Sequence, residues 1–412
     1  MTGTVAASAS ASASASASAS ASASASASAS ERLISLDAFR GFTIASMVLV
    51  NNPGDWGHIY TQLGHAKWDG WTFTDWVFPF FLFICGVSMT FALGRRAKAG
   101  ADRLSLIWQL GKRAAIIFGI GFLLNFIPYF NFETVRIPGV LQRIAICTLL
   151  AAPIVVYLGW LQQALWIVVL LAIYTALMLW LPVPDVAGNI AAGALEPGRD
   201  VGAFVDRYVL GGHLWVTSKT WDPEGLLSTI PALCSQLFGA LTGHWLLINF
   251  GNMSKQTKAG WMLIAGLVCL IIGSAIDATF MPINKSLWST SFCIFMTGWA
   301  LLIFSAFYWL IDANNVVLIR KKATEIFLPF TIYGMNALFI FALSGLIAKL
   351  LGFIKVSALN GTLMPLKSLI YAPFKTLPLS LENQSLLFGL LFNTLMFLVA
   401  WWMWKKKWFV KV

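Results

Sequence analysis

The chain has 412 residues, of which 58% are hydrophobic and only 11% are charged, and its mean hydropathy is +0.76. Soluble domains carry roughly 25% charged residues. A water-facing surface cannot be built from this composition, so most of the chain must face lipid. The net charge of +11 argues little for nucleic-acid binding, because the cations stand at the ends of apolar runs rather than in one patch.

The first thirty residues differ from the rest. Residues 7–30 alternate Ala and Ser without interruption, and the segment has neither the basic start nor the apolar middle of a signal peptide. We interpret 1–30 as a disordered low-complexity tail without a function. Residues 31–412 then form one transmembrane domain.

A helix that crosses the bilayer needs about 20 apolar residues. The stretch 361–380 is interrupted by three prolines, which predicts an interfacial or re-entrant piece rather than a further span. The expected fold is therefore all-α, a polytopic integral membrane protein of about ten transmembrane helices. The ten segments that qualify are 36–52, 76–94, 113–130, 139–158, 162–181, 229–249, 259–276, 290–311, 326–350 and 385–404.

The distribution of Arg and Lys predicts the orientation. Every strongly basic cluster falls in one set of alternate loops, which marks that face as cytoplasmic and places both termini there. The other loops are nearly neutral and face the periplasm or its equivalent, which predicts a multi-pass protein of the inner (plasma) membrane. The loop 182–228 on that side is long, and loops of this size often carry function.

Ionisable groups at the membrane edge are costly, so each is a functional candidate. The loop from the first to the second predicted span brings together Asn51, Asn52, His58, His65 and Asp75 between runs rich in Trp and Phe. A neutral histidine can accept a proton near neutral pH. For a histidine taken at random in such a loop, an ordinary surface role is the commoner explanation.

Arg143 lies about one turn inside the predicted span 139–158. A lone cation at this depth costs a few kcal/mol, so it needs a carboxylate or an anionic ligand as a partner. A structural salt bridge and a binding role are about equally plausible interpretations.

A third cluster joins WDPEG, with Asp222 and Glu224, to PINKSLWS, with Asn284 and Lys285. Both stretches precede predicted spans. Capping of free N–H groups at the helix starts would explain the acidic pair, but it does not explain Lys285 on the same rim.

The runs RLISLDAFRGFTIASMVLVNN and GHAKWDGWTFTDWVFPFFLFICG resemble the heparan-α-glucosaminide N-acetyltransferase family and its bacterial relatives. The runs RIPGVLQRIAI, WDPEGLLSTI, PINKSLWSTSF and IYGMNALFIF follow in the family's order. The resemblance covers residues 31–412 and rests on several ordered motifs.

This resemblance implies an enzyme that takes acetyl from cytosolic acetyl-CoA and passes it to the amine of a glucosamine-type sugar or glycan on the far side of the membrane. The family's active-site histidine matches His65. The resemblance also suggests a homodimer. The whole set of expected site residues is catalytic His65, Asn51, Asn52 and Asp75, coenzyme-binding Arg143, Lys285 and Asn284, and substrate-binding Asp222 and Glu224.

The chemistry fits these expectations. Transfer needs an amine delivered as its free base and a stabilised oxyanion. His65 can remove the amine proton or take the acetyl group itself, an asparagine of the pair 51–52 can donate to the thioester oxygen, and cations suit the coenzyme's phosphates. Four scattered histidines argue against a zinc centre. We expect acetyl-CoA as a co-substrate, and neither a metal nor a nucleic-acid partner.

Two alternatives stay open at this point. A transporter of an amino sugar or glycan precursor also fits ten spans with polar groups near broken helices, although the two halves show no convincing similarity. A structural membrane anchor is the third class, and polar clusters confined to one face disfavour it. Sugar uptake without acetyl-CoA would distinguish the transporter from the enzyme.

Overall fold

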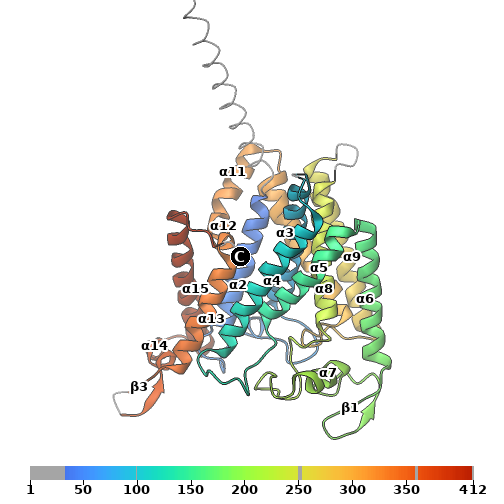
Figure 1. The fold of residues 1–412 in the computed structure, drawn as a ribbon. Coiled ribbons are helices and arrows are strands. Elements are labelled where there is room, and N and C mark those ends of the chain that lie inside the picture. Colours follow the sequence, from blue (N-terminus) through green and yellow to red (C-terminus); the bar gives the residue numbers. More distant parts are fainter. Residues whose placement is uncertain (1–32, 99, 249–252, 358–360, 411–412) are drawn as a thin grey trace, which may run out of the picture.

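The computed structural model describes residues 33–98, 100–248, 253–357 and 361–410, so the predicted Ala-Ser tail at 1–30 lies outside the described residues. The described chain is a bundle of long helices (Figure 1). Its long helices are α2 (Ile34–Asn51), α3 (Phe73–Lys98), α4 (Arg103–Phe126), α5 (Val140–Tyr157), α6 (Trp160–Trp180), α8 (Thr229–Leu247), α9 (Lys255–Thr279), α10 (Thr290–Tyr308, continued by the π-helix η2, Trp309–Ala313), α13 (Ala337–Phe353) and α15 (Leu381–Lys405). Shorter elements are η1 (Thr61–Leu63), α7 (Val201–Leu210), α11 (Val317–Ile326), α12 (Leu328–Met335), α14 (Leu366–Lys375) and the two antiparallel hairpins β1–β2 (Val183–Pro184, Ile190–Ala191) and β3–β4 (Lys355–Ser357, Leu363–Pro365).

The all-α membrane architecture is confirmed, since nine of the ten predicted segments each overlap one long helix and 326–350 overlaps α12 and α13. Within the described residues, eight helices are long and apolar enough to cross a membrane, or nine when the bent pair α12–α13 counts as one span. The remaining predicted segment, 229–249, corresponds to α8, which is long enough but is not among these apolar helices. It contains Gln236 and His244, and an interior helix of a bundle tolerates such residues because protein surrounds it.

The predicted span 326–350 is not one straight helix. It breaks between α12 and α13 with a bend of 79°. Asn336 stands at the break, where its side-chain amide donates to the carbonyl of Trp408 at 3.0 Å and its side-chain oxygen accepts from the N–H of Val410 at 2.9 Å. The C-terminal segment thus binds to the break. At 361–380 the structure has only the ten-residue α14 after a short strand, as the three prolines predict.

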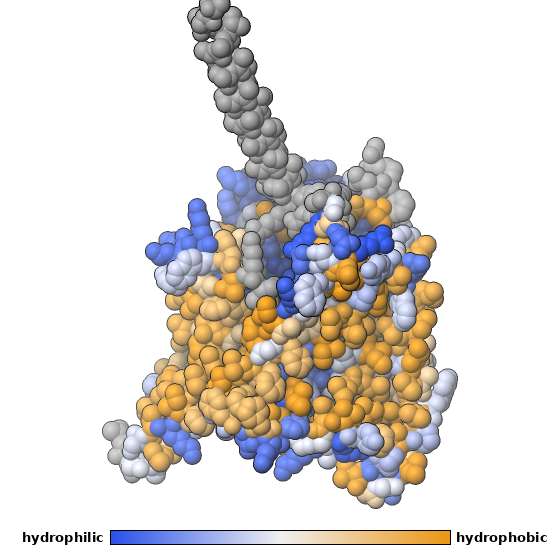
Figure 2. All heavy atoms as spheres, in the orientation of Figure 1, coloured by the Kyte–Doolittle hydropathy of each residue, from blue (hydrophilic) through white to orange (hydrophobic). Residues whose placement is uncertain are grey.

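The helices divide into an interior and a periphery. The apolar stretch of α3 is 72% buried, whereas that of α9 is 22% buried, and α4 and α6 resemble α9. Peripheral helices that expose apolar side chains are stable when those side chains face lipid. On the face that Figure 2 shows, apolar residues form a band across the middle of the molecule, with hydrophilic residues above and below it.

Two glycine contacts set the spacing of the interior helices. A Cβ at Gly86 of α3 would stand 1.8 Å from the Gln236 carbonyl oxygen of α8, and a Cβ at Gly239 would stand 1.9 Å from the Phe83 carbonyl oxygen. Small residues let membrane helices approach backbone to backbone. The starts of α3 and α8, which hold Asp75 and follow the WDPEG loop, are therefore fixed relative to each other.

The loops of the two predicted sets lie at opposite ends of the bundle (Figure 1). One end has α11, the C-terminal end of α8 and the start of α9. The other end has α7, the β1–β2 hairpin, α14 and the β3–β4 hairpin. We call this second end the α7 end.

Candidate active site

Asp75, at the start of α3, is fully buried and anchors the loop that precedes it. The N–H and the hydroxyl of Thr72 both donate to Asp75 Oδ2 at 3.0 Å, and the N–H of Ala66 donates to the same oxygen at 3.2 Å. A side chain that reaches back three residues in this way satisfies N–H groups that the first turn of a helix leaves free. The other carboxylate oxygen is left for a second partner.

His65 is that partner, and its Nδ1 lies 2.7 Å from Asp75 Oδ1. A carboxylate only accepts, so this hydrogen bond assigns the proton to Nδ1 and the lone pair to Nε2. The His65 side chain is 49% exposed, so Nε2 is accessible. An imidazole fixed at one nitrogen by a carboxylate and open at the other has the arrangement of a general base or a nucleophile.

Lys285 lies against the His65 ring. Its Nζ is 3.1 Å from Nδ1 and 3.0 Å from Nε2 of His65, and 4.0 Å from Asp75 Oδ1. The in-plane directions of the two ring nitrogens diverge, so one atom nearly equidistant from both lies over the face of the ring. The in-plane lone pair of Nε2 therefore stays free for a substrate.

The environment of Lys285 weakens its hold on a proton. Burial lowers the pKa of Lys285, while the carboxylates of Asp75 and Glu224 raise it and do not fully compensate. A fraction of neutral amine is therefore more accessible here than on an exposed lysine. Lys285 also places a positive charge where an oxyanion would form next to His65.

Asn284 joins the two loops that supply these groups. Its side-chain amide donates to Asp69 Oδ1 at 3.1 Å, its side-chain oxygen accepts from the N–H of Leu287 at 2.9 Å, and the N–H of Gly70 donates to the Ile283 carbonyl at 2.7 Å. Asp69 and Asn284 also form an antiparallel β-bridge. Since its side-chain groups bond within the protein, Asn284 holds the His65 loop against the Lys285 loop.

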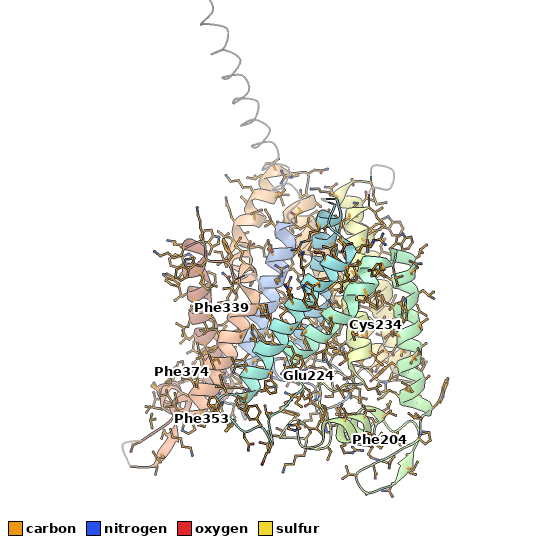
Figure 3. All side chains as sticks on the ribbon, viewed as in Figure 1. Phe204, Glu224, Cys234, Phe339, Phe353 and Phe374 are labelled. Atoms are coloured by element: carbon orange, nitrogen blue, oxygen red, sulfur yellow. The ribbon has the colours of Figure 1, made fainter. Side chains whose placement is uncertain are left out.

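A buried ion-pair cluster lies on the same rim. Arg136 Nε donates to Asp222 Oδ2 at 2.8 Å, and Arg136 Nη2 donates to Asp222 Oδ1 and to Glu224 Oε2, each at 2.5 Å. The two carboxylates raise the pKa of Arg136 despite its burial. Burial alone would raise the pKa of Glu224, but Arg136, Arg143 and Lys285 together lower it. Figure 3 labels Glu224 near the α7 end and Cys234 on α8.

The capping interpretation of the third cluster is wrong. Helix α8 begins at Thr229, and the residue before it is Ser228, so Asp222 and Glu224 lie too far upstream to cap it. Helix α10 is capped by Ser289, whose hydroxyl accepts from the N–H of Phe292, and not by Asn284 or Lys285. The acidic pair instead accepts hydrogen bonds from Arg136.

Arg143 is the fourth residue of α5 and only 1% exposed. Its Nη2 donates to the Gly225 carbonyl at 2.9 Å and to the Ser228 hydroxyl, and the guanidinium lies 5.2 Å from the centre of the Trp288 ring. In the described structure its Nε and Nη1 have no hydrogen-bond partner. Buried donors are nearly always paired, so these two N–H groups are suited to a polar ligand or water.

Sequence reasoning missed Asp206 of α7. Its carboxylate accepts from the N–H of Leu226 at 2.8 Å and from the N–H of Asp222 at 3.4 Å. It packs so closely that a Cβ at Gly225 would stand 2.0 Å from Asp206 Oδ2. Burial raises the pKa of Asp206 to about 7, and the nearby Asp222 adds to the rise. No motif around 201–210 signals this role.

The two predicted asparagines do not join the cluster. Asn51 is exposed, and the buried Asn52 donates its side-chain amide to the Val48 carbonyl of its own helix at 2.7 Å. Across the described hydrogen bonds, neither side chain reaches His65 or Lys285. Their predicted oxyanion role stays a prediction, and Lys285 is the closer donor. No group of three or more His, Cys, Asp or Glu that could hold a metal is found in the described part of the chain.

Comparison with known proteins adds an independent observation. The family model described as "Heparan-alpha-glucosaminide N-acetyltransferase, catalytic" matches residues 32–193. The heparan-alpha-glucosaminide N-acetyltransferase of Mus musculus is 28% identical over 364 residues, covering 76% of this chain and 53% of that protein. The Homo sapiens protein of that name is 28% identical over 358 residues, covering 75% and 52%. The chain is thus similar to members of this family over most of its described length.

The chain spans about half the length of the curated relatives that it matches. The matched stretch of the N-acetyltransferase family model contains His65, Asp75, Arg136 and Arg143, and ends before Asp222 and Lys285. The structure brings residues from both parts together at one end of the bundle, which the linear match alone does not show.

Proposed function

We propose that this membrane protein is an acetyltransferase that moves an acetyl group from acetyl-CoA, supplied from the cytoplasmic side, to the amine of a glucosamine-type sugar or glycan on the opposite side. The α7 end would then face the periplasm or its equivalent, in the inner (plasma) membrane, as the basic loops at the other end favour. The observation that carries the proposal is the Asp75–His65 pair, with Nδ1 held at 2.7 Å and Nε2 open.

In the first route, His65 Nε2 removes a proton from the attacking amine as it bonds to the acetyl carbon. In the second, Nε2 attacks the thioester itself and hands the acetyl group on to the amine. Asp75 stabilises the imidazolium in the first route and orients the ring in both. The Lys285 ammonium, 3.0 Å from Nε2, supports stabilisation of the oxyanion.

The buried groups behind His65 support binding of the donor. Arg143 has two unpartnered N–H groups, and with Lys285 it remains our candidate for the anionic or polar parts of acetyl-CoA; Asn284 positions Lys285. The interior between α2, α3, α5 and α10 is filled by packed apolar side chains such as Val48, Leu82 and Met296. A thioester arm that arrives from the other end therefore requires these helices to separate.

Asp222 and Glu224 are both engaged by Arg136. We propose that they contribute to the acceptor site by fixing Arg136 at the rim, where its guanidinium also lies 6.0 Å from the ring centre of Trp215. Trp221, next to Asp222, stacks edge-on with Trp68 at 5.1 Å. Aromatic faces beside hydrogen-bonding groups suit a sugar ring.

The test compares two histidines of the same loop in proteoliposomes supplied with labelled acetyl-CoA and glucosamine. His65→Ala is expected to lower transfer by about 10²-fold or more. The matched control is His58→Ala, because His58 also pairs with a carboxylate, Asp55 at 2.8 Å, and is 41% exposed. Equal transfer by the wild type and His65→Ala would remove His65 from the mechanism.

One observation favours the transporter alternative. The bent pair α12–α13 resembles the broken helices at which transporters bind their substrates. Uptake of labelled glucosamine into vesicles without acetyl-CoA would support it, and uptake that requires Asn336 but not His65 would separate the two functions.

A further inference from the structure

Lys285 presents a primary amine at the place that an acceptor amine must reach. Its Nζ lies 3.0 Å from His65 Nε2, and its side chain is only 17% exposed. An acetyl group delivered to His65, or held beside it, is then within contact distance of this amine. A sugar amine and a lysine amine are both primary amines, so the chemistry that serves one serves the other.

We propose that Lys285 is a self-acetylation site, modified when an acetyl thioester is bound and no sugar amine is present. This inference rests on the proposed function. In the step, the neutral Lys285 amine attacks the acetyl carbon, the C–N bond forms and the C–S bond breaks. The flexible lysine side chain moves from the face of the His65 ring to its edge as the nitrogen loses a proton to Nε2. His65 passes this proton to the departing thiolate, so a free thiol and N-acetyl-Lys285 result.

The surroundings make this reaction slow but available. The charged and titratable groups that face Lys285 are His65, Asp75, Glu224, Arg143 and Arg136. The two carboxylates favour the ammonium form, which cannot attack. Burial and the two arginines favour the neutral amine, and the net effect is a lowered pKa of Lys285. Labelling is therefore expected to rise with pH.

Acetylation would switch the site off. The modified side chain loses its positive charge, which leaves Asp75 and Glu224 without one of their cations. It also adds an acetyl group over the face of the His65 ring, where Nζ already lies 3.1 Å from Nδ1. A cell short of acceptor sugar would then accumulate inactive enzyme.

The experiment incubates purified full-length protein with labelled acetyl-CoA in the absence of sugar and locates the label by peptide mass spectrometry. Lys67 is an internal control, since it lies in the same loop as His65 and is exposed. Uncatalysed acetylation favours the exposed Lys67, whereas the proposed reaction favours Lys285 by about tenfold or more. His65→Gln is expected to lower labelling of Lys285 about 10²-fold and to leave Lys67 unchanged.

A second measurement follows transfer activity during the same incubation. Wild-type activity should decline as Lys285 becomes labelled, and Lys285→Arg, whatever its starting activity, should lose none of it with time. Sugar acetylation by an enzyme whose Lys285 stays unlabelled would overturn the inference and leave the proposed function intact. Equal labelling of Lys285 in wild type and His65→Gln would also overturn it. Absence of both sugar acetylation and Lys285 labelling would contradict the proposed function as well.

Discussion

Arg136 and Asp222 form a two-point ion pair, with Nε to Oδ2 at 2.8 Å and Nη2 to Oδ1 at 2.5 Å, that ties the loop before α5 to the loop before α8. The Asp222 side chain is fully buried and that of Arg136 is 23% exposed. Both charged groups are largely desolvated, and each compensates the charge of the other.

A double-mutant cycle tests this dependence. Arg136→Met and Asp222→Asn are each expected to destabilise the protein by about 3–5 kcal/mol, since each leaves a buried charge without its main partner. The double variant should lose less than the sum of the two. Thermal unfolding in detergent measures all four proteins. Additive losses would show that the pair does not couple the two loops.

The second prediction concerns Asp75→Asn. Oδ2 of Asp75 is surrounded by donors, so the asparagine oxygen takes that position and its amide faces His65. His65 Nδ1 must then accept, which moves the ring proton to Nε2 and removes the lone pair. We expect the transfer rate to fall by about 10²–10⁴-fold with the fold retained.

Its control is Asp55→Asn, which alters the similar pair with His58 at 2.8 Å. Transfer should change little in this variant. If Asp75→Asn kept the wild-type pH profile and rate, the tautomer assigned to His65 would be wrong.

The sequence predicts the helices better than the contacts between the site residues. Apolar length alone locates the long helices, because lipid demands about 20 such residues per crossing. It does not reveal the break at Asn336, since α12 and α13 are both apolar and the bend is stabilised by a C-terminal segment some seventy residues away. Long-range partners of this kind leave no local pattern.

The same limit applies to the site. His65 and Lys285 were both candidates, yet their contact joins residues 220 positions apart. Asp222 and Glu224 look like helix caps because an acid before Pro is typical of a helix start, and only the position of Arg136 shows otherwise. Asp206 could not be found, because an aspartate in a short amphipathic helix is ordinarily a solvated one.

The third prediction addresses the contact of α3 with α8. Gly239→Ala places a methyl group 1.9 Å from the Phe83 carbonyl oxygen, and backbone cannot rotate away as a side chain can. The helices must separate, at an expected cost of about 1–3 kcal/mol, and transfer activity should fall because the starts of α3 and α8 move apart.

Gly119→Ala in α4 is the matched control, since a Cβ there meets nothing within 4 Å. Alanine also favours helix over glycine by up to about 1 kcal/mol, so this variant should be as stable as the wild type or more so. Similar melting temperatures for Gly239→Ala and Gly119→Ala would contradict the close approach of the two helices.

The last prediction is a pH dependence that Asp206 confers on stability. Burial raises the pKa of its carboxyl to about 7, from 3.8. Between these values the folded protein holds a proton that the unfolded chain releases, so the stability due to this group falls as pH rises through the window and is constant above it. Asp206→Asn resembles the protonated form and should remove the fall. Its stability relative to wild type should therefore increase from pH 5 to 7, by at most about 1.4 kcal/mol per pH unit, in thermal unfolding scans.

Asp185→Asn is the control, because the pKa of Asp185 is lowered and its contribution is lost only toward acid pH. A difference between Asp206→Asn and wild type that does not change with pH would mean that Asp206 is ionised beneath the WDPEG loop, with its charge compensated by the surrounding N–H groups.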